Sequence, residues 1–392
     1  MNHSFIITEH KHHFIGASME DNKLQDLLIE EPRKENELYV GEVYLGCVQR
    51  VLTNIRAAFI ECKPGVTGYL ALKEGQRLKV GEEVMVQVAK AKVRSKQPVL
   101  RQRIEMVGRF LILYFYDDAS LGKTEPAVQI SQKITKDSLR QELRKIGEKQ
   151  MTIPGMTVIL RTSIQYAKPE WVQAEFELLY KKLETIRKNK DYRVKFSLLS
   201  PRQGDIKNYL LSQKPGNFHE ILTDSKEVYD EISSYLLPEE KITFYEDSYP
   251  LEAKYSLKHQ ISKAFSSHVW LKSGGSLMIE GTEALWVIDV NTQKAVLGKK
   301  DKEETFFKLN QEAAIEIAKQ IRIRELSGII LIDFIGMDQP EHERELLRIL
   351  KEECSKDPVQ TTVVDITKLG LVEMTRMKLR KPIVSYPFLK ED

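Results

Sequence analysis

The chain has 392 residues, of which 42% are hydrophobic and 30% are charged, and its formal net charge is +3. This length predicts two or three domains with substantial cores. The small net charge means that any site for a polyanion must come from local clustering of basic side chains. No apolar run approaches the length of a membrane span. We expect no signal peptide, because the N-terminal residues lack a cationic region followed by a long apolar run. Three cysteines without a C-x-x-C pair favour a reducing, cytoplasmic environment.

Short apolar runs within residues 1–36 predict a hairpin followed by a strand near Leu27–Ile29. Residues 37–119 contain several short strands separated by glycine turns, which predicts a small barrel. Phe59 and Tyr69 fall within these predicted strands. The pattern alone favours a place for both rings in the barrel core.

A basic segment with few acids follows the predicted barrel, and its members are Lys90, Lys92, Arg94, Lys96, Arg101, Arg103 and Arg109. Basic clusters commonly cover a solvated surface. Beside a barrel that binds single strands, however, the same lysines would contact phosphates and make binding sensitive to salt.

The middle of the chain alternates between predicted helices and strands. Apolar spacing predicts helices over Ser131–Ile146 and Trp171–Arg187, and Trp171 and Leu178 fall on the core-facing side of the second. Farther along the chain, Ser225 is placed to cap a helix.

Two short apolar runs, 284–291 and 328–334, predict buried strands, and each contains an aspartate near its end. Residues 303–326 lie between them and have apolar residues at helical spacing. Such a crossover returns the chain to the same sheet, so we expect Asp289 and Asp333 at one sheet edge. Two nearby carboxylates resist ionisation unless a cation lies between them. Magnesium takes one or two carboxylates, several waters and a substrate phosphate. The alternative is a pair of aspartates that cap turns or helices.

Polar residues near the pair extend this hypothesis. Asn291 lies two residues after Asp289 and therefore on the same side of the strand, where its amide could orient a ligand. Glu283 lies six residues before Asp289 and could assist the metal shell. Arg322 and Arg324 follow the predicted helix and could reach phosphate, although ordinary helix-end arginines are an equal alternative.

Several segments together resemble the catalytic signature of the bacterial ribonuclease E/G family: Glu280–Thr292, Glu303–Thr305, Leu309–Ala314, Ile332–Met337 and Leu369–Arg376. The resemblance covers nearly the whole chain and is strongest over residues 274–376. It implies that Asp289 and Asp333 hold Mg²⁺, for which Mn²⁺ could substitute, and that Asn291 supports them in catalysis.

The resemblance also implies an α+β multidomain fold. The expected parts are an RNase H-like subdomain from residues 1–36 and 201–265, an OB-type RNA-binding barrel over 37–119, a 5′-phosphate sensor region over 120–200, a DNase I-like catalytic subdomain over 266–385 and a tail over 386–392.

In such a barrel, bases stack on exposed aromatic rings beside a basic groove. The resemblance implies that Phe59 and Tyr69 are those rings, with Tyr69 in place of a phenylalanine. It places RNA-contacting lysines at Lys90 and Lys96.

The resemblance further implies that Arg161 and Thr162 recognise the 5′-monophosphate of the RNA, through a forked donor array and a short hydroxyl. The chain departs from the family pattern in the loop at 163–166, at Gly336, where an aspartate is usual, and at Lys368. Lys368 replaces an arginine that we expect to contact RNA, and it keeps the charge but not the bidentate fork.

The family's C-P-x-C zinc link has no counterpart after Lys378, where the sequence continues through residues 382–387 without a cysteine. We therefore expect no zinc link, and any homodimer must use another surface. The function implied is a Mg²⁺-dependent ribonuclease that cleaves single-stranded RNA internally, with a preference for a 5′-monophosphate, and leaves 5′-phosphate and 3′-hydroxyl ends. The alternatives are a non-catalytic RNA-binding or ribosome-associated protein with a retained fold, and a ribonuclease that trims RNA from its 5′ end.

Overall fold

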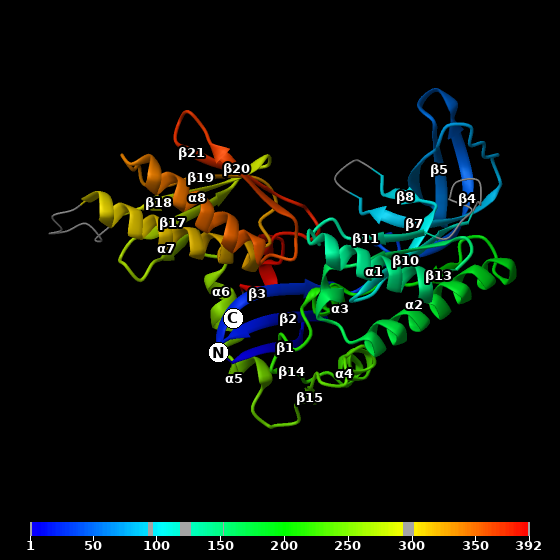
Figure 1. Cartoon of the computed structure of the whole chain (residues 1–392), viewed down its shortest axis with the longest axis horizontal. Helices are drawn as coiled ribbons and strands as arrows, with labels where there is room; N and C mark the ends of the chain where they lie inside the picture. Colours follow the sequence, from blue (N-terminus) through cyan, green and yellow to red (C-terminus); the bar gives the residue numbers. More distant parts are fainter. Residues whose placement is uncertain (1, 93–96, 118–126, 152, 293–301, 391–392) are drawn as a thin grey trace. The chain divides into compact units, whose positions relative to one another are not determined.

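The computed structural model describes residues 2–92, 97–117, 127–151, 153–292 and 302–390 (Figure 1). The chain forms two compact units, one made of Met1–Glu31 and Gly216–Asp392 and the other of Pro32–Pro215. Helices and several β-sheets occur in both, which confirms a mixed α/β protein with more than one domain. Within the described ranges, no helix combines the length and the apolar character that crossing a bilayer requires.

The second unit contains the predicted barrel. Its strands are β4 (Val43–Leu52), β5 (Ala57–Lys63), β6 (Val66–Ala71), β7 (Glu83–Lys90) and β8 (Val99–Arg101). They pair in the order β4-β5-β6-β8-β7, and β7 pairs again with β4, so the sheet closes on itself. Alternation along each strand turns apolar side chains such as Ile60, Leu70 and Val86 into a common core. This closed, OB-like barrel of five strands confirms the prediction.

The segment after residue 197 stays with the barrel. Strand β13 (Leu198–Ser200) pairs with β4, and the Arg202 guanidinium lies 5.0 Å from the centre of the Tyr39 ring. Helix α3 (Asp205–Ser212) follows. The second unit therefore ends at Pro215, later than the expected boundary at 201.

The rest of the second unit is a four-stranded sheet with the order β11-β12-β10-β9. Its elements are β9 (Arg103–Val107), β10 (Leu111–Tyr116), β11 (Ala127–Ile130), β12 (Met156–Leu160), η3 (Thr162–Tyr166), α1 (Asp137–Gln150), α2 (Pro169–Asn189) and η4 (Lys190–Tyr192). Both predicted helices exist with shifted starts. Helix α1 begins six residues later than Ser131 because the Arg140 guanidinium ties the carbonyls of Ser131 and Ile134 into a turn, each at 2.9 Å.

The buried side of α2 differs from the prediction. Its buried residues are Val172, Phe176, Leu179, Leu183 and Ile186, a stripe at positions three and four apart. Trp171 is only half-buried and stacks on Phe110 at 6.5 Å between ring centroids, and Leu178 is exposed. The prediction placed the core face about one residue too early.

The first unit contains a five-stranded sheet with the order β15-β14-β1-β2-β3. Its strands are β1 (His3–His10), β2 (His13–Glu20), β3 (Lys23–Glu30), β14 (Glu220–Thr223) and β15 (Ile242–Phe244). Strands β1, β2 and β3 are antiparallel, whereas β14 and β15 run parallel to β1. Helix α4 (Lys226–Ser233) follows β14, and the Ser225 hydroxyl accepts the Val228 N–H at 3.4 Å, which confirms the predicted cap. Short helices α5 (Leu251–Lys254) and α6 (Leu257–Lys263) pack nearby.

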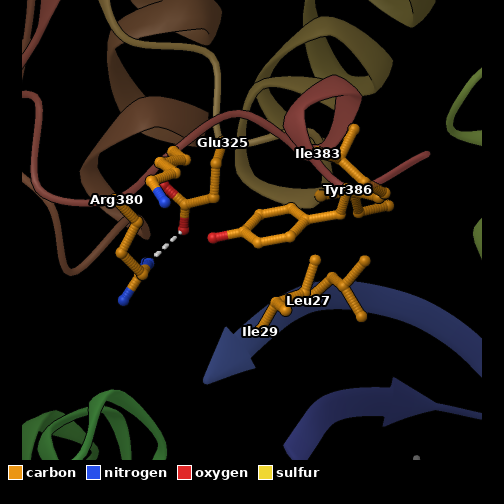
Figure 2. A pocket seen from close by; sticks show the side chains of 8 residues that line it. Leu27, Ile29, Glu325, Arg380, Ile383 and Tyr386 are labelled. Atoms are coloured by element: carbon orange, nitrogen blue, oxygen red, sulfur yellow. Dashed lines mark hydrogen bonds and ion pairs between the residues drawn. The ribbon is translucent and has the colours of Figure 1, made fainter. Parts of the chain in front are cut away.

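The end of the chain packs on this sheet through η5 (Ile383–Ser385) and η6 (Pro387–Leu389). The Tyr386 ring lies over Leu27 of β3 (Figure 2), and its hydroxyl donates to Glu31 at 2.8 Å. Tyr386 and Leu389 are 7% and 8% exposed. Within the expected tail at 386–392, Tyr386 and Leu389 therefore join the core, and Phe388 packs against it.

A second, six-stranded sheet of the first unit has the order β16-β17-β18-β19-β21-β20. Its elements are β16 (His268–Trp270), β17 (Ser276–Gly281), β18 (Leu285–Asn291), α7 (Lys302–Ile323), β19 (Gly328–Asp333), α8 (Pro340–Ser355), β20 (Thr361–Ile366) and β21 (Leu371–Arg376). Strands β18 and β19 are parallel neighbours joined through α7, so the predicted crossover is confirmed.

Helices α7 and α8 cover one face of this sheet (Figure 1). The two helices and that face form one hydrophobic core. Ile288 and Ile332 point into that core and are fully buried. Side chains alternate along a strand, so the residues next to Ile288 in β18 and next to Ile332 in β19 point to the opposite face of the sheet. Val287 and Ile329 on that face are 39% and 50% exposed.

Candidate active site

The sheet register brings the two predicted aspartates together. Asp289 of β18 and Asp333 of β19 are partners in the parallel ladder, and neighbouring strands lie about 5 Å apart. Ile288 and Ile332 precede them and are buried beneath the helices, so both carboxylates point to the open face. Asp289 is half-buried and Asp333 is exposed.

Asn291 is coupled directly to this pair. Its side-chain amide donates to Asp289 Oδ2 at 2.7 Å. A carboxylate has about four acceptor sites, so this bond orients Asp289 and leaves capacity for a cation. Asn291 therefore acts on the carboxylate, in addition to any contact with a ligand.

The loop after Asp333 is held from within the core by a residue to which the sequence analysis assigned no role. Asn310 of α7 is 0% exposed. Its amide donates to the Ile335 carbonyl at 2.8 Å and accepts the Ile335 N–H at 3.1 Å. The sequence held one signal for this role. Asn310 falls among the apolar residues of the predicted helix, and a buried amide requires hydrogen-bond partners.

Glu303, near the start of α7, fixes the next part of the same loop. Its carboxylate accepts the N–H groups of Asp338 at 3.1 Å and Gln339 at 3.3 Å, and it pairs with His342 Nδ1 at 2.8 Å. The His342 ring also stacks on Phe307 with centroids 4.1 Å apart. The Asp338 N–H, above all, holds the pKa of Glu303 below its ordinary value, and His342 and Gln339 add to this effect.

The turn between β16 and β17 approaches the end of β18 closely. A side chain at Gly275 would place its Cβ 2.8 Å from Leu309 Cδ1 and 2.9 Å from the Asn291 carbonyl oxygen. Only glycine permits this approach. Glu312 holds the same turn by accepting the N–H groups of Lys272 at 2.6 Å and Ser273 at 3.1 Å.

Other predicted site residues lie at different ends of the sheet. Lys368 is exposed in the turn between β20 and β21, and Leu371 after that turn pairs with Asp333. This register brings Lys368 to the end of the sheet that carries the carboxylates. Glu283 lies in the turn between β17 and β18, beyond the pairing of Gly281 with Trp286. Asp289 lies three residues farther along β18 than Trp286, about 10 Å of strand, so the structure does not bring Glu283 to the carboxylates.

The side chains of Arg322 and Arg324 bond to other residues of the first unit and do not form part of the carboxylate edge. Arg322 Nε lies 3.0 Å from Asp26 Oδ1 of β3. Arg324 is 5% exposed, and its Nε donates to Gln320 at 2.7 Å. Burial lowers the pKa of Arg324 to about 10, against the influence of Glu316. The phosphate-contact interpretation is wrong for Arg324 because its side chain is enclosed.

The donor chemistry at the sheet edge suits a hard cation. Two carboxylates and an amide leave room for waters and a phosphate, as Mg²⁺ prefers. Among the described residues, no group of three or more His, Cys, Asp or Glu side chains could hold a metal. A zinc site closed by four protein ligands therefore has no counterpart in the part of the chain that the structure describes.

The sequence model of the ribonuclease E/G family matches residues 106–379, more than half of the chain. This chain belongs to the ribonuclease E/G family. It is 32% identical over 387 residues to Ribonuclease E of Escherichia coli K12, covering 93% of this chain and 35% of that protein. It is 30% identical to the putative ribonuclease E of Buchnera aphidicola, covering 94% of this chain and 93% of that protein. Ribonuclease G of Escherichia coli K12 is 29% identical, with 94% and 78% covered. The chain thus spans about a third of the length of the first of these relatives.

The barrel of this ribonuclease E/G family member carries both predicted aromatic residues on its outer surface. Phe59 and Tyr69 are cross-strand partners with ring centroids 6.1 Å apart. Both are half-buried, whereas their neighbours Ile60 and Leu70 fill the core. The core placement favoured by the strand pattern is therefore wrong, because the strand alternation turns both rings outward.

Basic side chains continue the same row across the barrel. Arg50 pairs with Phe59 in the ladder, and its guanidinium lies 5.8 Å from the ring centre. On the other side, Tyr69 and Lys90 both pair with Val99. Lys90 is exposed. The row therefore has two adjacent aromatic rings in its middle and a cationic side chain at each end, with Val99 between Tyr69 and Lys90. Lys96 lies outside the described residues.

The two predicted phosphate-binding residues follow β12 in the family's match region. Arg161 is half-buried, and its guanidinium donates to the Gly108 carbonyl. Burial lowers the pKa of Arg161, while nearby Glu175 opposes this shift. The Thr162 hydroxyl lies 3.1 Å from that of Ser131. Both side chains are therefore held in place by neighbours that the sequence pattern did not reveal.

Proposed function

We propose that this protein is a ribonuclease that cleaves single-stranded RNA internally, with Asp289 and Asp333 in its active site. The observation that carries the proposal is the register pairing of the two carboxylates on the open face, in a chain of the ribonuclease E/G family. Hydrolysis would leave a 5′-phosphate on one product and a 3′-hydroxyl on the other.

The two carboxylates would hold one Mg²⁺ ion, for which Mn²⁺ could substitute. When bound, such an ion lowers the pKa of a water and stabilises charge on the phosphoryl group. Asn291 would keep Asp289 in its ligating orientation through the 2.7 Å bond. Lys368 would neutralise a phosphate at the same end of the sheet. Asn310 and Glu303 would fix the loop after Asp333.

The barrel would hold the RNA strand by stacking and by phosphate contacts. Phe59 and Tyr69 offer two neighbouring rings on the outer surface, and Arg50 and Lys90 lie in the same row. Rings and cations in one row suit a single strand, because bases stack while the backbone follows the charges. Lys96 is proposed as a further contact on the strength of the resemblance.

A 5′-monophosphate would bind at Arg161 and Thr162. A guanidinium has five N–H donors in a fork, so Arg161 can bind phosphate oxygens as well as the Gly108 carbonyl. Rigid neighbours support such recognition, because a side chain that is already ordered loses less entropy on binding.

The finer domain assignment is part of this proposal. The sheet of β1, β2, β3, β14 and β15, with three antiparallel strands followed by two parallel ones, supports an RNase H-like subdomain. The sheet that carries the carboxylates would be DNase I-like. The expected setting is cytoplasmic RNA processing or decay, and a homodimer would form without a zinc bridge.

The experiment is incubation of the full chain with 5′-monophosphorylated, 3′-end-labelled single-stranded RNA, in Mg²⁺ or in EDTA. Internal cleavage predicts discrete intermediate fragments that appear only with the metal. A ladder shortening from the 5′ end would indicate the trimming mode. RNA binding without products would favour the non-catalytic alternative, which the departures at Gly336 and Lys368 make worth testing.

A further inference from the structure

Trp270 is an exposed tryptophan on the sheet that carries the two aspartates. It ends the edge strand β16 and is 66% exposed. Trp286 of the same sheet packs against the core and covers Gly281. Large aromatic side chains are stabilised by burial or by contact with another group. An exposed tryptophan is therefore a candidate binding residue, and its position relative to the carboxylates indicates what it would bind.

Trp270 lies on the same face as Asp289. Val269 packs against the helix-covered core, so its neighbours His268 and Trp270 point to the opposite face. The ladders run from Trp270 through Ser276 to Asn291, and from His268 through Met278 to Asp289. Two strand spacings, about 10 Å, therefore separate Trp270 from Asn291.

Two neighbours complete a surface suited to one nucleotide. The His268 ring lies 4.5 Å from the Trp270 ring at an angle of 65°, so it supports one side of the indole. Lys272 is exposed in the turn that follows, and Glu312 holds the backbone of that turn. An exposed aromatic face with a cation two residues farther along the chain suits the base and the phosphate of a single strand.

We propose that Trp270 stacks on a base of the RNA next to the scissile phosphate, with Lys272 contacting the phosphate of the same nucleotide. Trp270 would act as a positioning residue, and this inference rests on the proposed function. The ligand that we propose is single-stranded RNA, because the ladder pairings place Trp270 on the same face of the sheet as Asp289, which would bind the phosphodiester. A stacked base contributes about 1–3 kcal/mol, which corresponds to about a 5- to 150-fold change in affinity.

The test combines protein variants with abasic RNAs. One single-stranded oligoribonucleotide with a mapped cleavage site is prepared intact and as a series, each with one abasic nucleotide near that site. Wild type, Trp270→Ala, Trp270→Phe and the control Ile329→Ala are compared by KM and kcat, and by binding in EDTA. Ile329 is an exposed apolar residue of the same face at the far end of β19.

For wild type, we expect one abasic position to raise KM and weaken binding by about 5- to 150-fold. Trp270→Ala should weaken binding of intact RNA to a similar degree and lose sensitivity to that one abasic position. Trp270→Phe should retain most of the affinity, and Ile329→Ala should resemble wild type.

The proposal is overturned if Trp270→Ala binds and cleaves every oligonucleotide like wild type, or stays as sensitive as wild type to every abasic position. It is equally overturned if Trp270→Ala only converts a dimer into monomers in sedimentation, with RNA affinity unchanged, because the occupant would then be a second copy. Failure of wild type to cleave RNA would refute the proposed function instead. The binding series in EDTA would still decide the role of Trp270.

Discussion

Asn310 holds both backbone groups of Ile335, accepting its N–H and donating to its carbonyl. One buried side chain in α7 thus fixes the loop that leaves Asp333. Replacement by Ala would leave the Ile335 backbone groups without these partners, at a cost of about 1–3 kcal/mol in stability.

We predict that Asn310→Ala lowers kcat on single-stranded RNA by about 10- to 100-fold, as for other residues that orient metal ligands. RNA affinity in EDTA should change little. The control is Ile315→Ala, an exposed position of the same helix, measured with the same RNA. Equal activity of Asn310→Ala and Ile315→Ala would show that the loop needs no such anchor.

The row on the barrel makes a separate prediction about binding. Phe59→Ala and Tyr69→Ala should each weaken binding of single-stranded RNA by about 5- to 150-fold, because each removes a stacking surface. Lys90→Ala should reduce the slope of log K against log salt by about 0.7, the value for one phosphate contact on a single strand. Fluorescence anisotropy at several salt concentrations measures both effects. Ile55→Ala, an exposed apolar position of the same unit, is the control, and equal losses in all variants would contradict the row.

Glu303 gives a prediction about pH. Its pKa in the folded chain lies below the ordinary value of 4.5. A lowered carboxyl pKa means that the folded state favours the ionised form. The stabilising contribution of Glu303 is therefore present above about pH 4.5 and is lost as the pH falls through the lowered pKa.

Glu303→Gln should accordingly be less stable than wild type near neutral pH, and the difference should shrink as the solution becomes acidic. Urea denaturation of both proteins at pH 7, 5 and 4 measures this. Glu304→Gln changes a more exposed carboxylate of the same turn and should show a smaller effect. A difference that grows towards low pH would contradict the assignment.

The packed end of the chain makes a stability prediction. Tyr386→Ala removes a 7% exposed ring and its bond to Glu31, so it should destabilise the first unit by about 3 kcal/mol or more. Val384→Ala, at a 55% exposed position in the same segment, should have little effect. Hydrogen exchange of strands β1 to β3 reports on this unit directly. Unchanged exchange in Tyr386→Ala would show that the segment is dispensable.

Local pattern predicted the elements that depend on short-range physics. The apolar runs before Asp289 and Asp333 gave the strands, and helical spacing gave the crossover that makes them parallel neighbours. The hydroxyl of Ser225 predicted the start of α4. Each of these follows from alternation, spacing or capping within a few residues.

Contacts between distant segments could not be predicted in this way. Tyr386 is buried by β3, which precedes it by more than 350 residues. Trp171 stacks on Phe110 of the turn between β9 and β10, about sixty residues earlier in the chain. The sequence pattern places Arg324 at a helix end, where arginines are usually exposed. Its burial comes from segments that are distant in the sequence. The outward direction of Phe59 required the register of the closed barrel.

The most direct measurement of the central claim is metal binding by wild type and by variants of the paired aspartates. Calorimetric titration with Mn²⁺, competed by Mg²⁺, should give one ion per chain for wild type. Asp289→Asn and Asp333→Asn should each weaken binding by more than about 100-fold, beyond the 10- to 100-fold typical of a supporting residue. Asp338→Asn, the same charge change in the loop after β19, should bind like wild type. Undiminished binding of the ion by both Asp289→Asn and Asp333→Asn would contradict the account.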